Sequence, residues 1–155
     1  MDGPEGRGWK RIDAESPHLS FSMPDDWNAV EVRANAIAAV SPELDETRYR
    51  SNVTIAETPL SSIGDIQQFG DDHLRDLERV LTDFRLIEVS DAAVGTMPGI
   101  RLTASFRQGQ YDLTLDEWLG LTDLTLVSAT AIATDFDYAG DVASFEQIVA
   151  SIGDA

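Results

Sequence analysis

The 155-residue chain contains no cysteine. This absence excludes a disulfide framework, a thiolate nucleophile and a cysteine-ligated zinc site. Imidazoles are also scarce: the only two histidines are His18 and His73, and neither lies beside a serine in a nucleophile-elbow pattern. There is no Walker loop and no dinucleotide fingerprint, because the glycines from Gly3 to Gly8 precede no strong strand and include no phosphate-binding lysine. We therefore predict that the protein is not an enzyme, and we assign it no catalytic residue, metal ligand or cofactor.

Basic residues are few compared with acidic ones, and Lys10 is the only lysine. Eleven lysines and arginines face 28 aspartates and glutamates, which gives a net charge of −17 at pH 7 and a pI near 4.1. Phosphate backbones and anionic lipid surfaces are repelled by such a chain, so nucleic-acid and membrane-surface roles are not expected. A cationic protein partner would be attracted, although solubility or a high-salt host explains the same acidity.

Long apolar runs are missing as well. No stretch approaches the roughly 18 apolar residues that a membrane-spanning helix needs. The first six residues, Met1 to Gly6, have neither the basic nor the apolar segment of a secretory signal. We therefore expect a cytoplasmic protein without membrane insertion.

The strongest pattern that is present lies between Ile100 and Thr134, where three consecutive segments alternate apolar and polar residues. Alternation with a period of two is typical of strands that bury one face, and Gln108-Gly109 supplies a turn, so we predict an antiparallel meander. The third strand carries a face of small residues that suits close packing by a helix; these are Val127, Ala129, Ala131 and Ala133.

Two segments have helical rather than strand periodicity. From Ile63 to Phe84, apolar residues recur at spacings of three and four behind a possible Ser62–Asp65 capping box, and Asp141–Ile152 has one apolar face. Shorter strands are predicted at 19–23, 30–33, 37–40, 52–57 and 84–89. The expected fold class is therefore α+β, a twisted antiparallel sheet packed with helices.

The domain organisation is predicted to be simple. Residues 1–17 are rich in glycine and acidic residues, which indicates a mobile leader with a short edge strand at 9–12. Residues 18–153 form a single domain. Trp27 follows the turn-forming Pro24-Asp25-Asp26, and we interpret it as a core residue near the helix face of Phe145 and Ile148, so Trp27→Ala is expected to be destabilising and Trp9→Ala nearly neutral.

Three acidic groupings are candidates for chemistry, but each has a simpler explanation. Residues 135–146 partly match a calcium loop, yet Ala139 stands where an oxygen ligand is needed and a strand enters where the motif requires a helix. The alternative is a strand-to-helix turn at Asp135 and Asp137, with Asp141 as the helix cap. The Asp71-Asp72-His73 cluster is interpreted as a solvated helix face.

The third grouping is the pair of carboxylates on one strand, Asp112 and Asp116, followed by Glu117. Asp112 and Asp116 share the polar face of that strand with Trp118. In so acidic a chain we interpret this face as solvated and assign it no acid–base role.

Several short motifs, taken in order, resemble the PsbP-like/Mog-type fold family, which includes DcrB-like and LpqN-like proteins. The opening Phe21-Ser-Met-Pro24-Asp-Asp-Trp27 resembles that group's F-x-x-P-x-x-W segment, and Asn52-Val53-Thr-Ile55 resembles its N-v-x-V strand. The helix from Ser62, the Gly99-Ile-Arg-Leu element and the closing Phe145–Ile152 helix match in order. The similarity covers residues 19–152.

The resemblance implies a sheet-and-helix sandwich without catalytic residues. Members of that group act as binding or assembly factors: some bind a small GTPase, some join a photosystem and some chaperone hydrophobic helices of secreted effectors. Unlike DcrB-like and LpqN-like members, this chain has no signal segment at its start. The resemblance favours a non-catalytic interaction module, an adaptor or chaperone for a secretion or envelope system with a protein partner of unknown identity. The alternative is a small-ligand or lipid carrier with a cavity between sheet and helix.

Overall fold

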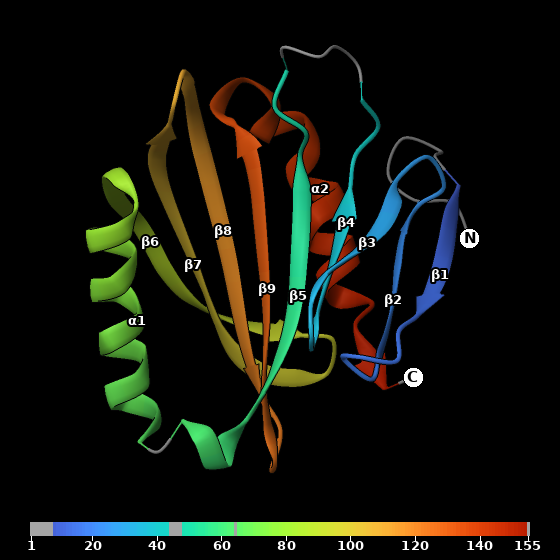
Figure 1. Ribbon diagram of the computed structural model, residues 1–155, viewed down its shortest axis with the longest axis vertical. Coiled ribbons are helices and arrows are strands. Elements are labelled where there is room, and N and C mark those ends of the chain that lie inside the picture. Colours follow the sequence, from blue (N-terminus) through green and yellow to red (C-terminus); the bar gives the residue numbers. More distant parts are fainter. Residues whose placement is uncertain (1–7, 44–47, 64, 155) are drawn as a thin grey trace.

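The computed structural model describes residues 8–43, 48–63 and 65–154, with the side chains of residues 66 and 67 left aside. A large seven-stranded sheet has the order β3-β4-β5-β9-β8-β7-β6, and a small three-stranded sheet has the order β1-β2-β10. Helix α2 lies behind the large sheet and close to β2, and α1 lies beside β6 and β7 (Figure 1). The predicted α+β class is confirmed.

The elements have the following bounds. The strands are β1 Trp9–Asp13, β2 Leu19–Pro24, β3 Asn28–Arg33, β4 Ala36–Val40, β5 Asn52–Pro59, β6 Thr82–Val94, β7 Met97–Gln108, β8 Tyr111–Leu121, β9 Thr125–Thr134 and β10 Gly153–Asp154. The helices are the short 3-10 helix η2 Leu60–Ser62, α1 Ile66–Val80 and α2 Asp135–Ala150. Among the described residues, no helix is long and apolar enough to cross a membrane.

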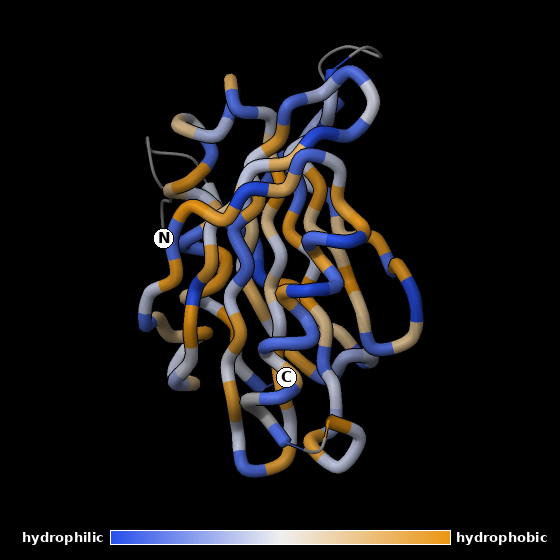
Figure 2. The backbone as a smooth tube through the Cα atoms, turned by 90° about the vertical axis from the view of Figure 1, so that its left-hand side faces the viewer, coloured by the Kyte–Doolittle hydropathy of each residue, from blue (hydrophilic) through white to orange (hydrophobic). Residues whose placement is uncertain are grey.

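The predicted meander is present as β7, β8 and β9, each paired antiparallel with the next. Hydrophilic and hydrophobic residues follow one another closely along the extended parts of the backbone (Figure 2). Buried and less buried residues alternate along most of β9, so its two faces differ in environment. Gly109 closes the β7–β8 turn with a φ of 58°, a left-handed conformation that glycine adopts without strain. Strand β7 begins at Met97, three residues before the predicted start of the meander at Ile100.

The main core lies between α2 and the large sheet. Ala129, Ala131 and Ala133 on β9 are completely buried, and they pack in one cluster with Phe145 and Ile148 of α2. Small side chains let the helix backbone approach the strand closely, so the predicted helix-packing face is confirmed.

The opposite sheet face carries a second core beneath α1. Leu77 and Leu81, near the end of α1, pack over buried residues of β7 and β8, which are Leu102, Ala104, Phe106, Leu113 and Leu115. The helix begins after Asp65, whose Oδ1 atom accepts a hydrogen bond from the Gln68 amide at 3.2 Å. Asp65 therefore caps the helix, whereas the predicted partner Ser62 donates to the Pro59 carbonyl.

The short edge strand predicted at residues 9–12 of the leader is present as β1. Residues Trp9–Asp13 form β1 and pair along their whole length with β2. Trp9 and Ile12 pack against the main core because the ladder holds them there. Ordered structure thus begins before residue 18, while residues 1–7 lie outside the described residues.

Candidate functional site

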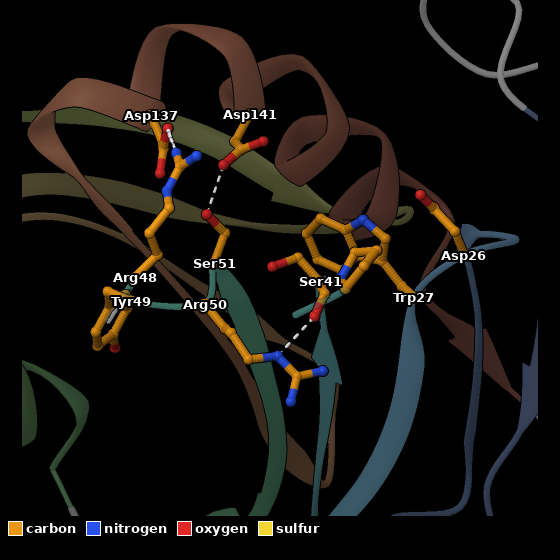
Figure 3. A pocket seen from close by; sticks show the side chains of 10 residues that line it. Asp26, Trp27, Ser41, Arg48, Tyr49, Arg50, Ser51, Asp137 and Asp141 are labelled. Carbon is orange, nitrogen blue, oxygen red and sulfur yellow. Dashed lines mark hydrogen bonds and ion pairs between the residues drawn. The ribbon is translucent and has the colours of Figure 1, made fainter. Parts of the chain in front are cut away.

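Two adjoining hollows lie at the N-terminal end of α2, and we call them together the α2 groove. The first, the tryptophan hollow, has a volume of about 180 Å³. Figure 3 shows it between α2 and the segment that leads into β5. It is lined by Asp26, Trp27, Ser41, Pro42, Arg48, Tyr49, Arg50, Ser51, Asp137 and Asp141.

The second hollow, the tyrosine hollow, is larger and more open, with a volume of about 490 Å³. It is lined by Arg48, Tyr49, Gln110, Tyr111, Asp112, Thr134, Asp135, Phe136 and Asp137. Because Arg48, Tyr49 and Asp137 line both hollows, the two hollows adjoin at these residues.

The end of β9 and the start of α2 build one wall of this groove. Thr134 stands in the N-cap position, and its Oγ1 atom accepts a hydrogen bond from the Asp137 amide at 3.1 Å. Asp135 and Asp137 occupy the first helical turn, where the helix dipole favours negative charge. The helix thus begins six residues before the predicted cap at Asp141, and the prediction of a strand-to-helix turn there is wrong. Since residues 135–146 are helical, they cannot form a calcium loop.

The other wall is attached to α2 by polar contacts. Arg48 donates from Nη2 to Asp137 Oδ1 at 2.9 Å, and Ser51 donates from Oγ to Asp141 Oδ2 at 2.5 Å (Figure 3). Ser51 is therefore paired with a carboxylate and has no histidine base among the residues that line the groove. This arrangement can recognise charged or hydrogen-bonding groups, but it provides no activated nucleophile.

Aromatic side chains give the groove its apolar surface. Trp27 is 2% exposed and meets Phe145 edge-to-face with ring centroids 6.4 Å apart, as predicted. Tyr49 and Tyr111 meet edge-to-face at 5.6 Å, and burial raises the pKa of Tyr49 despite the hydrogen bond from Asn52. Phe136, in contrast, is 90% exposed on the first turn of α2.

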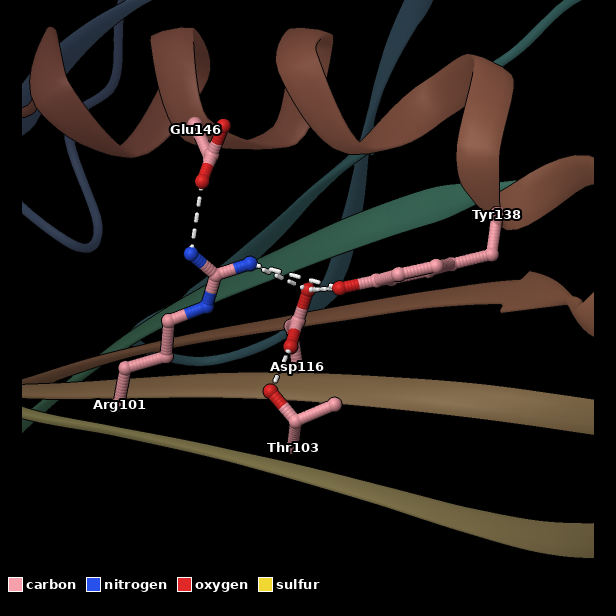
Figure 4. Close-up of polar contacts among 5 residues, drawn as sticks. All are labelled: Arg101, Thr103, Asp116, Tyr138 and Glu146. Atoms are coloured by element: carbon pink, nitrogen blue, oxygen red, sulfur yellow. Dashed lines mark hydrogen bonds and ion pairs between the residues drawn. The ribbon is translucent and has the colours of Figure 1, made fainter. Parts of the chain in front are cut away.

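A buried ionic cluster holds the middle of α2 on the sheet. Asp116 of β8 is fully buried and accepts hydrogen bonds from Thr103 Oγ1 at 2.5 Å and from the Tyr138 hydroxyl at 2.5 Å. Arg101 of β7 bridges Asp116, at 2.8 Å, and Glu146 of α2, at 2.7 Å (Figure 4). The predicted solvated face of β8 is therefore wrong at Asp116, because α2 covers it.

Charge and burial together tune the protonation of this cluster. Burial lowers the pKa of the Arg101 guanidinium, but hydrogen bonds to Asp116 and Glu146 outweigh that effect and raise it overall. Burial and the neighbouring Asp116 raise the pKa of Tyr138 to about 12, so its hydroxyl remains a donor at neutral pH. Arg101 also lies 4.5 Å over the Trp118 ring, a cation–π contact. Through Tyr138 and Glu146 the cluster anchors α2 to the sheet.

A separate polar contact joins α1 to the opposite sheet face. His73 Nε2 is hydrogen-bonded to the buried Glu117, which also accepts from Thr130 Oγ1 at 2.9 Å. Asp71 and Asp72 are exposed, as predicted, but the solvated-face prediction fails for His73 because it points to the sheet. Among the described residues, no group of three or more potential ligands could hold a metal ion.

This contact predicts a pH dependence of stability. The hydrogen bond with Glu117 and the charges of Glu117 and Asp76 raise the pKa of His73, although burial acts against them. Because the folded pKa lies above the ordinary value of about 6.5, the stabilisation is fully present below that value and is lost as pH rises through the folded pKa. Urea titrations should show that His73→Gln lowers the free energy of unfolding more at pH 6 than at pH 9.

His18 provides the matched control because it is exposed and is the only other histidine. His18→Gln, a substitution at an exposed site, should change the free energy of unfolding by less than about 0.5 kcal/mol at either pH. A His73→Gln effect of equal size at pH 6 and pH 9 would contradict the assignment of a charged His73–Glu117 contact.

Comparison with known proteins identifies the fold. No protein-family model matches the sequence, and no curated protein matches it. The chain is similar in structure to LpqN, involved in cell envelope biogenesis of Mycobacterium tuberculosis, with a TM-score of 0.67 and 14% identity over 94% of this chain and 89% of that one. It is also similar to cyanobacterial PsbP from Synechocystis, with a TM-score of 0.66 and 12% identity over 100% of this chain and 98% of that one.

A third similar structure is the Ran-binding protein Mog1p of Saccharomyces cerevisiae. The TM-score is 0.61 and the identity 10%, over 95% of both chains. With identities this low, the similarity shows only that the helices and strands are arranged in the same way. The chain has the PsbP/Mog-like fold that its sequence motifs predict.

Proposed function

We propose that the protein is a non-catalytic protein-binding module and that the α2 groove is its binding surface. The observation that carries this proposal is Phe136, which is 90% exposed at the rim of a groove lined by tyrosines and carboxylates. An exposed phenylalanine ring is unfavourable in water. Covering the ring with a partner protein therefore contributes favourable binding free energy. Aromatic residues are also enriched among those that contribute most to protein interfaces.

The charge of the chain indicates the kind of partner. A net charge of −17 favours encounter with a cationic protein and slows the approach of an acidic one. The shared fold with the Ran-binding Mog1p supports a protein partner, and that with LpqN supports the more specific role of an adaptor or chaperone in a secretion or envelope system.

The carrier alternative has less support from the structure. The space between α2 and the large sheet is filled by packed side chains, including Trp27, Phe145 and the β9 alanines, and by the Asp116 cluster. The two hollows of the groove lie at the end of this interface and open to solvent. A partner that covers them from outside fits this geometry better than an enclosed lipid.

The proposal predicts that the binding of a partner depends on Phe136. Tagged protein should capture a stoichiometric protein from its own host, and Phe136→Ser should reduce that capture at least tenfold, a change of about 1.4 kcal/mol. Capture should also weaken as salt is raised, because the attraction is partly electrostatic. The measurement is quantitative mass spectrometry of the captured material.

Leu124→Ser is the matched control, since Leu124 is 78% exposed in the β8–β9 turn, away from the groove. This variant should capture the partner as the parent does. Equal capture by the Phe136→Ser and Leu124→Ser variants would contradict the proposal, as would a stoichiometric small molecule in place of a protein.

A further inference from the structure

We propose that the tyrosine hollow is a pocket for an arginine side chain of the partner protein. This inference rests on the proposed function, because it specifies the chemistry by which that partner is recognised. With a volume of about 490 Å³, the hollow is large enough to admit a long side chain from outside.

The walls of the hollow suit a flat cation. Tyr49 and Tyr111 stand edge-to-face, with an angle of 60° between their rings, and Phe136 projects from the first turn of α2. Aromatic faces carry negative potential and attract a guanidinium group that stacks on them. Phe136 has most of its ring surface available for such a contact.

Carboxylates supply the complementary charge. Three line the hollow, from Asp112, Asp135 and Asp137, against one guanidinium, from Arg48. Each carboxylate uses its Oδ1 atom within the chain: Asp112 with Arg107 Nε at 3.0 Å, Asp135 with Thr114 Oγ1 at 2.7 Å and Asp137 with Arg48 Nη2 at 2.9 Å. Within the described part of the chain, no hydrogen bond engages the Oδ2 atoms of these three carboxylates, and these atoms can accept hydrogen bonds from a ligand.

The chain itself contains an example of the proposed contact. Asp137, on the wall of the hollow, already holds the guanidinium of Arg48. Arginine fits the site better than lysine, because its planar group can stack on a ring and donate to two carboxylate oxygens at the same time. The strongly hydrated ammonium of lysine gains less from the aromatic walls.

The test uses the whole protein and three blocked tripeptides with arginine, lysine or norleucine between two glycines. Titration of the ¹⁵N-labelled protein with the arginine peptide should give saturable shifts of the amides of residues 48–49, 110–112 and 134–137, with a Kd on the order of millimolar. The lysine peptide should bind at least about threefold more weakly, and the norleucine peptide should not saturate.

Substitutions distinguish specific binding in the tyrosine hollow from a general attraction of cationic peptides to the acidic protein. Asp135→Asn and Tyr111→Leu should each weaken the arginine peptide about threefold or more, whereas Asp123→Asn, an exposed site in the β8–β9 turn, should not. No saturation with the arginine peptide, equal binding of the lysine peptide, or equal effects of Asp135→Asn and Asp123→Asn would overturn the inference. If the peptides fail while Phe136→Ser still abolishes capture of the partner, only the arginine pocket is wrong; if both fail, the proposed function fails too.

Discussion

Replacing Asp116 by alanine is expected to lower the free energy of unfolding by about 3–5 kcal/mol, because it leaves the Arg101 charge without its buried partner. Asp116 is 0% exposed, so water cannot replace the lost carboxylate. Domains of this size have a total stability of about 5–15 kcal/mol, so the variant should lose a substantial part of its stability. Urea titrations followed by circular dichroism measure the difference.

Two further variants make this prediction specific. Asp112→Ala, on the same strand but in an exposed ion pair with Arg107, should leave the urea midpoint close to that of the parent protein. The double variant Arg101→Met with Asp116→Leu should be more stable than Asp116→Ala alone, because it removes both charges and fills the space with apolar atoms. If the double variant is no more stable than Asp116→Ala, the loss does not come from an unpaired charge.

Trp27→Ala should be comparably damaging, with a loss of about 3–5 kcal/mol from lost burial and the cavity left behind. Trp27 is 2% exposed and closes the main core against Phe145 of α2. Phe136→Ala, which truncates an aromatic ring that is 90% exposed, should change stability by less than about 0.5 kcal/mol. The pair of urea titrations contradicts the account if the two variants have similar midpoints.

The expected effect of Trp9→Ala on stability differs between a mobile leader and the observed strand. In a mobile leader its truncation would be neutral, but Trp9 is partly buried in β1 and packs against the main core. We therefore expect Trp9→Ala to lie between Trp27→Ala and Phe136→Ala in stability. The reason is that a half-buried ring loses only part of its burial free energy.

The meander and the helix-packing face of β9 were predictable because alternation is a local property of a strand. The burial of Asp116 was not, since the pattern of β8 assigns residues to faces but does not say whether a helix covers the polar one. Trp118 on that same face, opposite Arg101 of the neighbouring strand, was the available signal of a covered surface.

The α2 groove shows a second limit of sequence analysis. Arg48 and Tyr49 come from an aperiodic segment, and only the tertiary fold brings them to Asp137. The start of α2, in contrast, could have been predicted, because Thr134-Asp135-Phe136-Asp137 has the spacing of a capping box. The predicted helix start at Asp141 overlooked this signal. The cytoplasmic location stays a prediction.

The central claim is that a protein partner binds in the α2 groove, and hydrogen–deuterium exchange of the protein with its captured partner tests it most directly. The account predicts protection of amides in residues 48–51, 110–112 and 134–141, with little change elsewhere. The edge strand β6 offers the main competing surface, since Leu86, Ile87 and Val89 are exposed there. Protection confined to residues 86–89, with exchange in the groove unchanged, would contradict the account.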